Sequence, residues 1–191
     1  SRTLVTSKAT GVSGSASAGY TIFQPYAGET AVMDGTTVST SGDEGMILIE
    51  DHSYIRIKGL EIRNNKSSSA SVVPIGIFVQ GGSHHIELLD NYVHHIETNA
   101  GSNGNAHGIA IYGSSAAQAI TNVIVANNEI ANCKLGSSES MVLNGNVTGF
   151  SVTNNYVHDN DNIGIDFIGF EGVCPTVSLD QARNGVCTDN L

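Results

Sequence analysis

The 191-residue sequence contains no tryptophan, three prolines, three cysteines and only eight lysine and arginine residues. Eighteen acidic side chains outnumber these cations and give a formal net charge of -10, which excludes a basic surface for nucleic acid or for an anionic membrane. There is no run of 18 apolar residues, so we expect no segment that crosses a bilayer. The chain begins with Ser1 rather than Met, which is consistent with a removed signal peptide, and we expect a secreted protein.

The three cysteines allow one disulfide and one free thiol. Cys174 and Cys187 would close a short loop in an oxidising compartment, and Cys133 would be left over. The alternative is that all three are small, buried apolar residues.

A thirteen-residue unit recurs along the chain, and its members begin at residues 53, 84, 121 and 148. The four copies are SYIRIKGLEIRNN, HHIELLDNYVHHI, TNVIVANNEIANC and TGFSVTNNYVHDN, and a fifth, RNGVCTDNL, begins at residue 183 and is cut short. The starts lie 31, 37, 27 and 35 residues apart, so the inserts vary while the unit is constant. This behaviour is typical of a solenoid with variable loops at its corners.

Aligned positions of the unit predict stacked columns. Three columns are apolar and are expected to point inward: Ile55, Ile86, Val123 and Phe150; Ile57, Leu88, Val125 and Val152; and Ile62, Val93, Ile130 and Val157. The eighth position is Leu60 followed by Asn91, Asn128, Asn155 and Asn190. Side-chain amides stacked at strand spacing, about 4.8 Å, are expected to hydrogen-bond to one another in a ladder.

A second short strand precedes each unit, at residues 46–49, 76–79, 108–111, 140–143 and 164–167. Two or three short strands per turn predict an all-β parallel β-helix, a single-stranded solenoid of five to six coils forming one domain over residues 1–191. Leucine-rich and propeller arrays are disfavoured, because neither consensus is present. The incomplete fifth copy, and the lack of a clear N-terminal cap, suggest a fragment of a longer helix, open to end-to-end self-association.

The unit x-V-x-N-N-x-V-x-x-N, preceded by G-I-x-I, resembles the repeats of the pectate-lyase-like superfamily of right-handed parallel β-helix proteins. Residues 20–35 resemble the early coil of that family, and together these features cover most of the chain. The resemblance implies an extracellular protein that acts on polysaccharides. It specifies the chemistry poorly, because the scaffold also carries hydrolases, epimerases and adhesive proteins.

Lyases of this superfamily use calcium held by clustered carboxylates, with Lys or Arg as the base, to remove a proton beside a uronate. The outward column Leu48, Phe78, Ala110 and Val142 ends in a charge at Asp166, which indicates a function at that coil. The candidate calcium ligands are Asp159, Asp161, Asp166 and Glu171. The alternative without a bound ion is that Asp159 and Asp161 are solvated corner residues and that Asp166 pairs with Arg183.

Candidate catalytic residues are Arg183, Lys134 and Asp166, and candidate substrate-binding residues are Arg183, Asn184 and Tyr156. For Arg183, a carboxylate-binding role is favoured over a base, because the pKa of arginine is high. A histidine metal site is disfavoured, because His94 and His158 stand two coils apart, about 9.6 Å from twice the strand spacing. The apolar outward column also requires a cover, either its own loops or a partner.

Three functions follow. The first is a calcium-assisted lyase that cleaves an acidic polysaccharide by β-elimination. The second is a non-catalytic structural, filament-forming, adhesive or carbohydrate-binding module. The third is a glycoside hydrolase, for which Asp166 and Glu171 are the candidate carboxylate pair.

Overall fold

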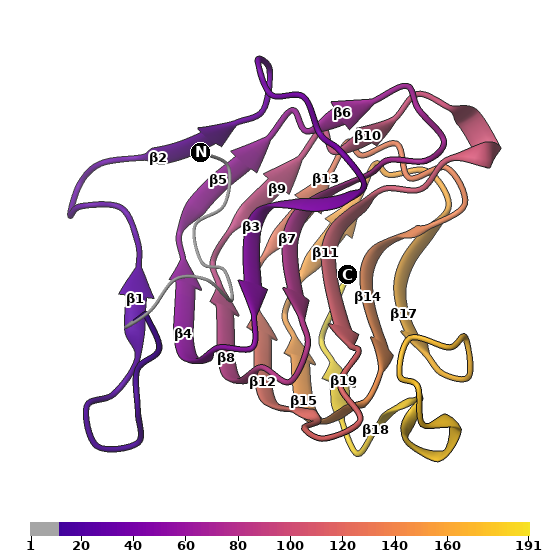
Figure 1. Ribbon diagram of the computed structural model, residues 1–191. Coiled ribbons are helices and arrows are strands. Elements are labelled where there is room, and N and C mark those ends of the chain that lie inside the picture. The colour runs from indigo at the N-terminus through magenta and orange to yellow at the C-terminus, as the bar shows by residue number, and fades with distance from the viewer. Residues whose placement is uncertain (1–11) are drawn as a thin grey trace.

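The computed structural model describes residues 12–191 as a stack of parallel strands that coil around one apolar core (Figure 1). Sheet 1 has the strand order β1-β4-β8-β12-β15-β18, and β19 also pairs with β15. Its strands are β1 (Thr21–Phe23), β4 (Ser53–Lys58), β8 (His84–Leu89), β12 (Ile120–Ala126), β15 (Val147–Thr153), β18 (Ala182–Arg183) and β19 (Val186–Thr188).

Two further sheets each contribute one strand per coil. Sheet 2 consists of β3 (Asp43–Glu50), β7 (Val73–Gln80), β11 (His107–Gly113), β14 (Glu139–Gly145) and β17 (Ile163–Ile168). Sheet 3 consists of β2 (Ala31–Asp34), β5 (Leu60–Arg63), β9 (Tyr92–His94), β13 (Glu129–Ala131) and β16 (Tyr156–His158). The remaining elements are the pair β6 (Lys66–Ser67) and β10 (Glu97–Thr98), and two short 3-10 helices, η1 (Gly101–Asn103) and η2 (Val177–Leu179).

The predicted parallel β-helix is confirmed, and so is its register. Ile55, Ile86, Val123 and Phe150 are direct neighbours across β4, β8, β12 and β15. The other two predicted inward columns are likewise in register, and nearly all of these side chains are buried in the main core.

The predicted asparagine ladder is present at the corner between sheets 1 and 3. The amide of Asn91 donates to Asn128 Oδ1 at 2.9 Å, Asn128 donates to Asn155 Oδ1 at 2.9 Å, and Asn155 donates to Asn190 Oδ1 at 2.9 Å. Each Oδ1 also accepts the backbone N–H of the preceding asparagine, and each amide reaches a backbone carbonyl. The polar groups that the corner buries are therefore satisfied within the ladder.

The corners turn through left-handed backbone at equivalent positions of successive coils. In each unit, the residue directly before the ladder position has a positive φ. In chain order these residues are Gly59, Asp90, Asn127, Asn154 and Asp189. Glycine, asparagine and aspartate tolerate this region best, which explains the Asn-Asn pairs that mark the repeat.

The outward apolar column of sheet 2 is covered by the chain itself. Phe78, Ala110 and Val142 are buried in a second apolar cluster with Ile75. Partly buried side chains packed on that cluster are Leu48, Val73, Tyr112 and Ile168. Val73, the first residue of β7, therefore belongs to this cover.

The predicted disulfide is wrong, because all three cysteines are free thiols. Cys187 lies on β19 and is exposed, within 3.2 Å of the Asn190 amide. Cys174 is buried, and its Sγ faces the Ser115 carbonyl. Cys133 and Cys174 thus fit the alternative of small buried residues. Within residues 12–191 no helix is long and apolar enough to cross a membrane, and the expectation about an N-terminal cap lies outside the described residues.

Candidate functional site

A cavity of about 300 Å³ opens on the outer face of sheet 2, the sheet that lies nearest the viewer in Figure 1. Residues from or beside all five strands line it. Its polar lining consists of Asp43, Asn105, His107, Tyr112, Ser137, Ser138, Glu139 and Glu171, and its apolar lining of Val73, Ile75 and Ile168.

A break in strand alternation turns His107 and Glu139 toward this cavity. They stand two residues before the inward residues Ile109 and Met141, so strict alternation would place them in the core. The intervening position instead faces inward: a Cβ on Gly108 would lie 2.6 Å from Ile130 Cγ2. Glycine at this position lets β11 kink, and the His107 side chain is released to the outside. In β14 the equivalent position is Ser140, another small residue, which is fully buried.

A hydrogen-bonded chain connects the side chains of Tyr112 and His107 to the backbone of Glu139. His107 Nδ1 donates to the Glu139 carbonyl at 3.2 Å, which leaves Nε2 to accept from the Tyr112 hydroxyl at 3.2 Å. Burial lowers the pKa of His107 to about 4, so the imidazole is neutral at ordinary pH. A neutral ring with this tautomer acts as a fixed link between Tyr112 and the strand that carries Glu139.

The pKa of the Glu139 carboxyl is shifted in the direction that favours proton donation. Burial, followed by the nearby charges of Asp166 and Glu171, raises the pKa of its carboxyl. Its side chain is only 11% exposed and approaches His107 Nδ1 at 3.5 Å. A carboxyl that keeps its proton to higher pH can serve as a general acid.

Two further carboxylates share this face. Glu171 follows β17 and accepts the Asn144 amide at 2.9 Å, and Asp166 on β17 accepts the N–H of Phe167 at 2.8 Å. Asn144 is buried, and its Oδ1 is one of two buried side-chain polar atoms of residues 12–191 that lack a hydrogen-bond partner; the other is Ser140 Oγ. No lysine or arginine lines the cavity.

The other two predicted calcium ligands lie at the corner before β17. Asp159 Oδ2 lies 2.9 Å from His158 Nδ1, and Asp161 Oδ1 accepts the N–H of Leu135 at 2.5 Å. Asp161 thus bonds to the preceding coil, while Asp159 is a largely exposed partner of its neighbour His158. In the part of the chain that the structure describes, no group of three or more His, Cys, Asp or Glu side chains could hold a metal ion. Calcium binding stays a prediction.

The predicted basic and substrate-binding residues lie elsewhere. Arg183 on β18 donates to the carbonyls of residues 179 and 181 and to Asn146 Oδ1, so it is not an ion-pair partner of Asp166. Lys134 lies 3.9 Å from Glu97. On the other two sheets, Asn184 donates to Thr148 Oγ1 and Tyr156 stacks on His158.

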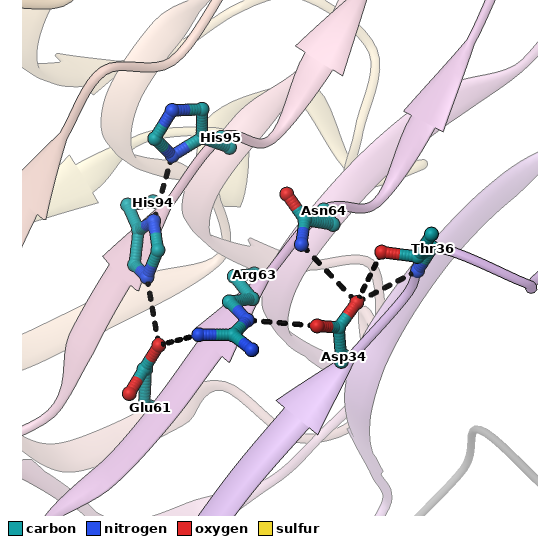
Figure 2. Close-up of polar contacts among 7 residues, drawn as sticks. All are labelled: Asp34, Thr36, Glu61, Arg63, Asn64, His94 and His95. Atoms are coloured by element: carbon teal, nitrogen blue, oxygen red, sulfur yellow. Dashed lines mark hydrogen bonds and ion pairs between the residues drawn. The ribbon is translucent and has the colours of Figure 1, made fainter.

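A second polar network lies on the outer face of sheet 3 and differs in its charge balance (Figure 2). Arg63 donates to Asp34 at 2.8 Å and to Glu61 at 2.5 Å, and His94 Nε2 lies 3.2 Å from the same Glu61 oxygen. Burial alone would raise the pKa of Glu61, but hydrogen bonds from His94 and Arg63 hold it below its ordinary value. Each acid here has a cationic or imidazole partner, which is typical of a structural network.

Sequence reasoning missed His107, Tyr112 and Glu139. It placed Asp166 correctly in the outward column of sheet 2, but assigned no role to the position before the glycine that recurs in this sheet. The signal was there: Gly76 and Gly108 occupy the same place in successive coils, and polar His107 and Glu139 precede that place in two of them.

Comparisons with known proteins give one relative and no activity. No protein-family model matches the chain, and no solved structure matches it. The chain is 42% identical over 164 residues to the uncharacterized protein YwoF of Bacillus subtilis (strain 168). That match covers 85% of this chain and 34% of YwoF, so the chain spans about a third of the length of the relative.

Proposed function

We propose that the chain is a polysaccharide-active β-helix that cleaves a glycosidic bond by general acid catalysis at the sheet 2 cavity. Glu139 is the proton donor, and Glu171 is the second carboxylate. The observation that carries the proposal is the environment of Glu139: a nearly buried carboxyl in a cavity, with its pKa raised by burial and by two neighbouring acids. Glycosidases divide acid and base roles between two carboxyls in this way.

The remaining lining residues suit a sugar. Ile168 and Val73 offer apolar surface to the faces of a pyranose ring, and Tyr112, Ser137 and Asn105 offer hydroxyl and amide groups to its hydroxyls. The lining extends across all five stacked strands of sheet 2, which provides room for a polymer. The resemblance to pectate-lyase-like repeats supports the same class of substrate and an extracellular location.

The calcium-assisted lyase is the second candidate. One observation favours it: the charges of Asp166 and Glu171 both raise the pKa of Glu139. Negative charge is therefore concentrated where a cation could bridge the protein to a uronate. Against it, the predicted bases Arg183 and Lys134 bond elsewhere.

Glu139→Gln tests the proposal in the full chain, with Glu50→Gln as the matched control. Glu50 lies at the end of β3 in the same sheet, accepts from Gln80 and does not line the cavity. Both variants and the native chain are assayed for reducing ends released from neutral, amino-sugar and uronate polysaccharides. We expect Glu139→Gln to lower kcat by about 10²- to 10⁴-fold, the usual range for a general acid, with an unchanged melting curve, while Glu50→Gln keeps native activity.

The pH profile and a chelator separate the alternatives. The alkaline limb of the native profile is expected above the ordinary glutamate value of 4.5, because the pKa of Glu139 is raised, and that limb disappears in Glu139→Gln. A uronate polymer could instead release unsaturated products that absorb ultraviolet light, and a chelator could stop that release. This result would show a calcium-assisted lyase and not a hydrolase. Full activity of Glu139→Gln would refute both the role of Glu139 as proton donor and the sheet 2 cavity as the active site. Binding of a polysaccharide without turnover by the native chain would favour a carbohydrate-binding module.

A further inference from the structure

The sheet 2 cavity carries negative charge that the protein does not balance. Asp43, Glu139 and Glu171 line it, and Asp166 acts on Glu139 from the same sheet. The lysines and arginines of residues 12–191 are bonded on other surfaces, in the pairs Arg56–Glu87, Lys58–Asp90, Arg63–Asp34, Lys66–Glu97 and Lys134–Glu97, and in the carbonyl contacts of Arg183. The contrast with the balanced network on sheet 3 shows that this fold elsewhere places cations beside its acids.

The acids of the cavity are held by neutral donors. Glu171 accepts an amide hydrogen of Asn144, and an amide leaves the carboxylate charge in place. Asn144 stands in the same outward column as Tyr112 and Ile168, which both line the cavity. It is 2% exposed, and its Oδ1 has no partner. An orphaned acceptor beside uncompensated carboxylates points to a ligand that brings hydrogen-bond donors and positive charge.

A protonated amine meets these requirements better than a metal ion. Calcium needs six to eight oxygen ligands, and among the described residues no group of three or more His, Cys, Asp or Glu side chains could hold a metal ion. An ammonium group has three N–H donors and can be satisfied by one or two carboxylates with neutral acceptors. A uronate carboxylate would instead be repelled by every charged group that lines the cavity.

We propose that the polysaccharide bound at this cavity carries free, protonated amino groups, as a de-N-acetylated amino-sugar polymer does, with Asp43 as the carboxylate that binds the ammonium. This inference rests on the proposed function for the sugar part of the ligand. It reverses the expectation of an acidic polysaccharide, because the charge of the cavity has the same sign as a uronate. The apolar lining from Val73 and Ile168 accounts for the ring that carries the amine.

Binding and turnover are measured separately so that the two proposals can fail independently. Calorimetry on the full-length Glu139→Gln variant compares glucosamine oligomers, their fully N-acetylated counterparts, galacturonate oligomers and oligolysine. We expect glucosamine oligomers to bind about ten-fold or more tightly than the acetylated forms, the equivalent of one charge-assisted hydrogen bond. Asp43→Asn in the same background is expected to remove most of that preference, and Glu50→Gln to leave it unchanged.

Added salt is expected to weaken glucosamine binding and to leave binding of the acetylated oligomers nearly unchanged, because only the former includes an ion pair. Asp43 is exposed, so its substitution leaves the fold intact, and a circular dichroism spectrum of the variant checks this. Equal affinity for acetylated and free-amine oligomers, or tighter binding of galacturonate, would overturn the inference even if a neutral polymer is cleaved. Oligolysine binding as tightly as glucosamine oligomers would overturn the sugar assignment. An amine preference without cleavage of any polymer would instead overturn the proposed reaction alone.

Discussion

The asparagine ladder offers a quantitative test of how the coils are held in register. Asn128 lies in its middle and is 1% exposed. Its Oδ1 accepts the backbone N–H of Asn91 at 3.0 Å and the Asn91 amide at 2.9 Å, while its own amide donates to Asn155 Oδ1 and to the Leu88 carbonyl at 2.9 Å each. Asn128→Ala removes all of these contacts and inserts no new polar group.

The cost of this substitution follows from the groups left behind. The N–H of Asn91 loses the Asn128 acceptor, and the Leu88 carbonyl loses the Asn128 donor, in a place that water does not reach. Each unsatisfied buried group costs about 1–3 kcal/mol, so we expect Asn128→Ala to lower the free energy of unfolding by about 2–6 kcal/mol. Asn190→Ala is the control, because Asn190 occupies the partly exposed end of the same ladder, and its loss should cost only about 0.5–1.5 kcal/mol.

Urea titrations followed by circular dichroism give the global free energies, and hydrogen exchange at Asn91 N–H gives the local one. The exchange measurement is needed because solenoids can open coil by coil, which breaks a two-state analysis. The expected result is faster exchange at Asn91 in Asn128→Ala and no change there in Asn190→Ala. A loss of stability in Asn128→Ala no larger than in Asn190→Ala would refute the claim that buried amide stacking holds the coils together.

Three further predictions concern the kink, a corner and the thiols. Gly108→Ala should destabilise the fold by at least about 1 kcal/mol in a urea titration, since its Cβ would meet Ile130 at 2.6 Å; native stability would contradict the kink. The pKa of His158 is raised, by its hydrogen bond to Asp159 first and to Glu129 after it, so this pairing stabilises below the unfolded value near 6.5 and is lost as pH rises through the folded value. The stability difference between native chain and His158→Gln should therefore shrink from pH 6 to pH 9, and a constant difference in melting temperature would count against the ion pairing. Under native conditions an alkylating reagent should label Cys187 fast and Cys133 slowly, because burial raises the pKa of Cys133 to about 11; mass spectrometry of the labelled peptides checks the order.

The repeat could be predicted from sequence because each coil buries the same positions. A column such as Ile57, Leu88, Val125 is visible as a periodicity, and stacking requires nothing beyond equal register. The ladder was predictable for the same reason, since an asparagine that recurs at one corner has its neighbours defined by the repeat.

The cavity could not be predicted in the same way, because it depends on a departure from the repeat. Alternation counted outward from Ile109 assigns His107 to the core, and only the kink at Gly108 reverses that assignment. The lining also combines Asp43 with Glu171, which are brought together by the stack and by loops of unequal length. The sequence showed one charged residue, Asp166, in the otherwise apolar outward column. Asp166 lies on the outer face of sheet 2, as the cavity does, but it does not line the cavity.

Buried side-chain amides are fully hydrogen-bonded in the ladder but not beside the cavity, and Asn144 allows this difference to be tested. In the ladder both ends of each amide are bonded, whereas Asn144 donates to Glu171 and leaves Oδ1 without a partner, at a cost of about 1–3 kcal/mol. A fold optimised for stability alone would have an apolar residue there, as Ile168 is in the next coil of the same column. Asn144→Leu should therefore keep or raise the free energy of unfolding while it weakens glycan binding by about ten-fold through the loss of an acceptor and of the donor that orients Glu171. Loss of more than about 2 kcal/mol of stability with unchanged binding would show that Asn144 serves the fold and not the site.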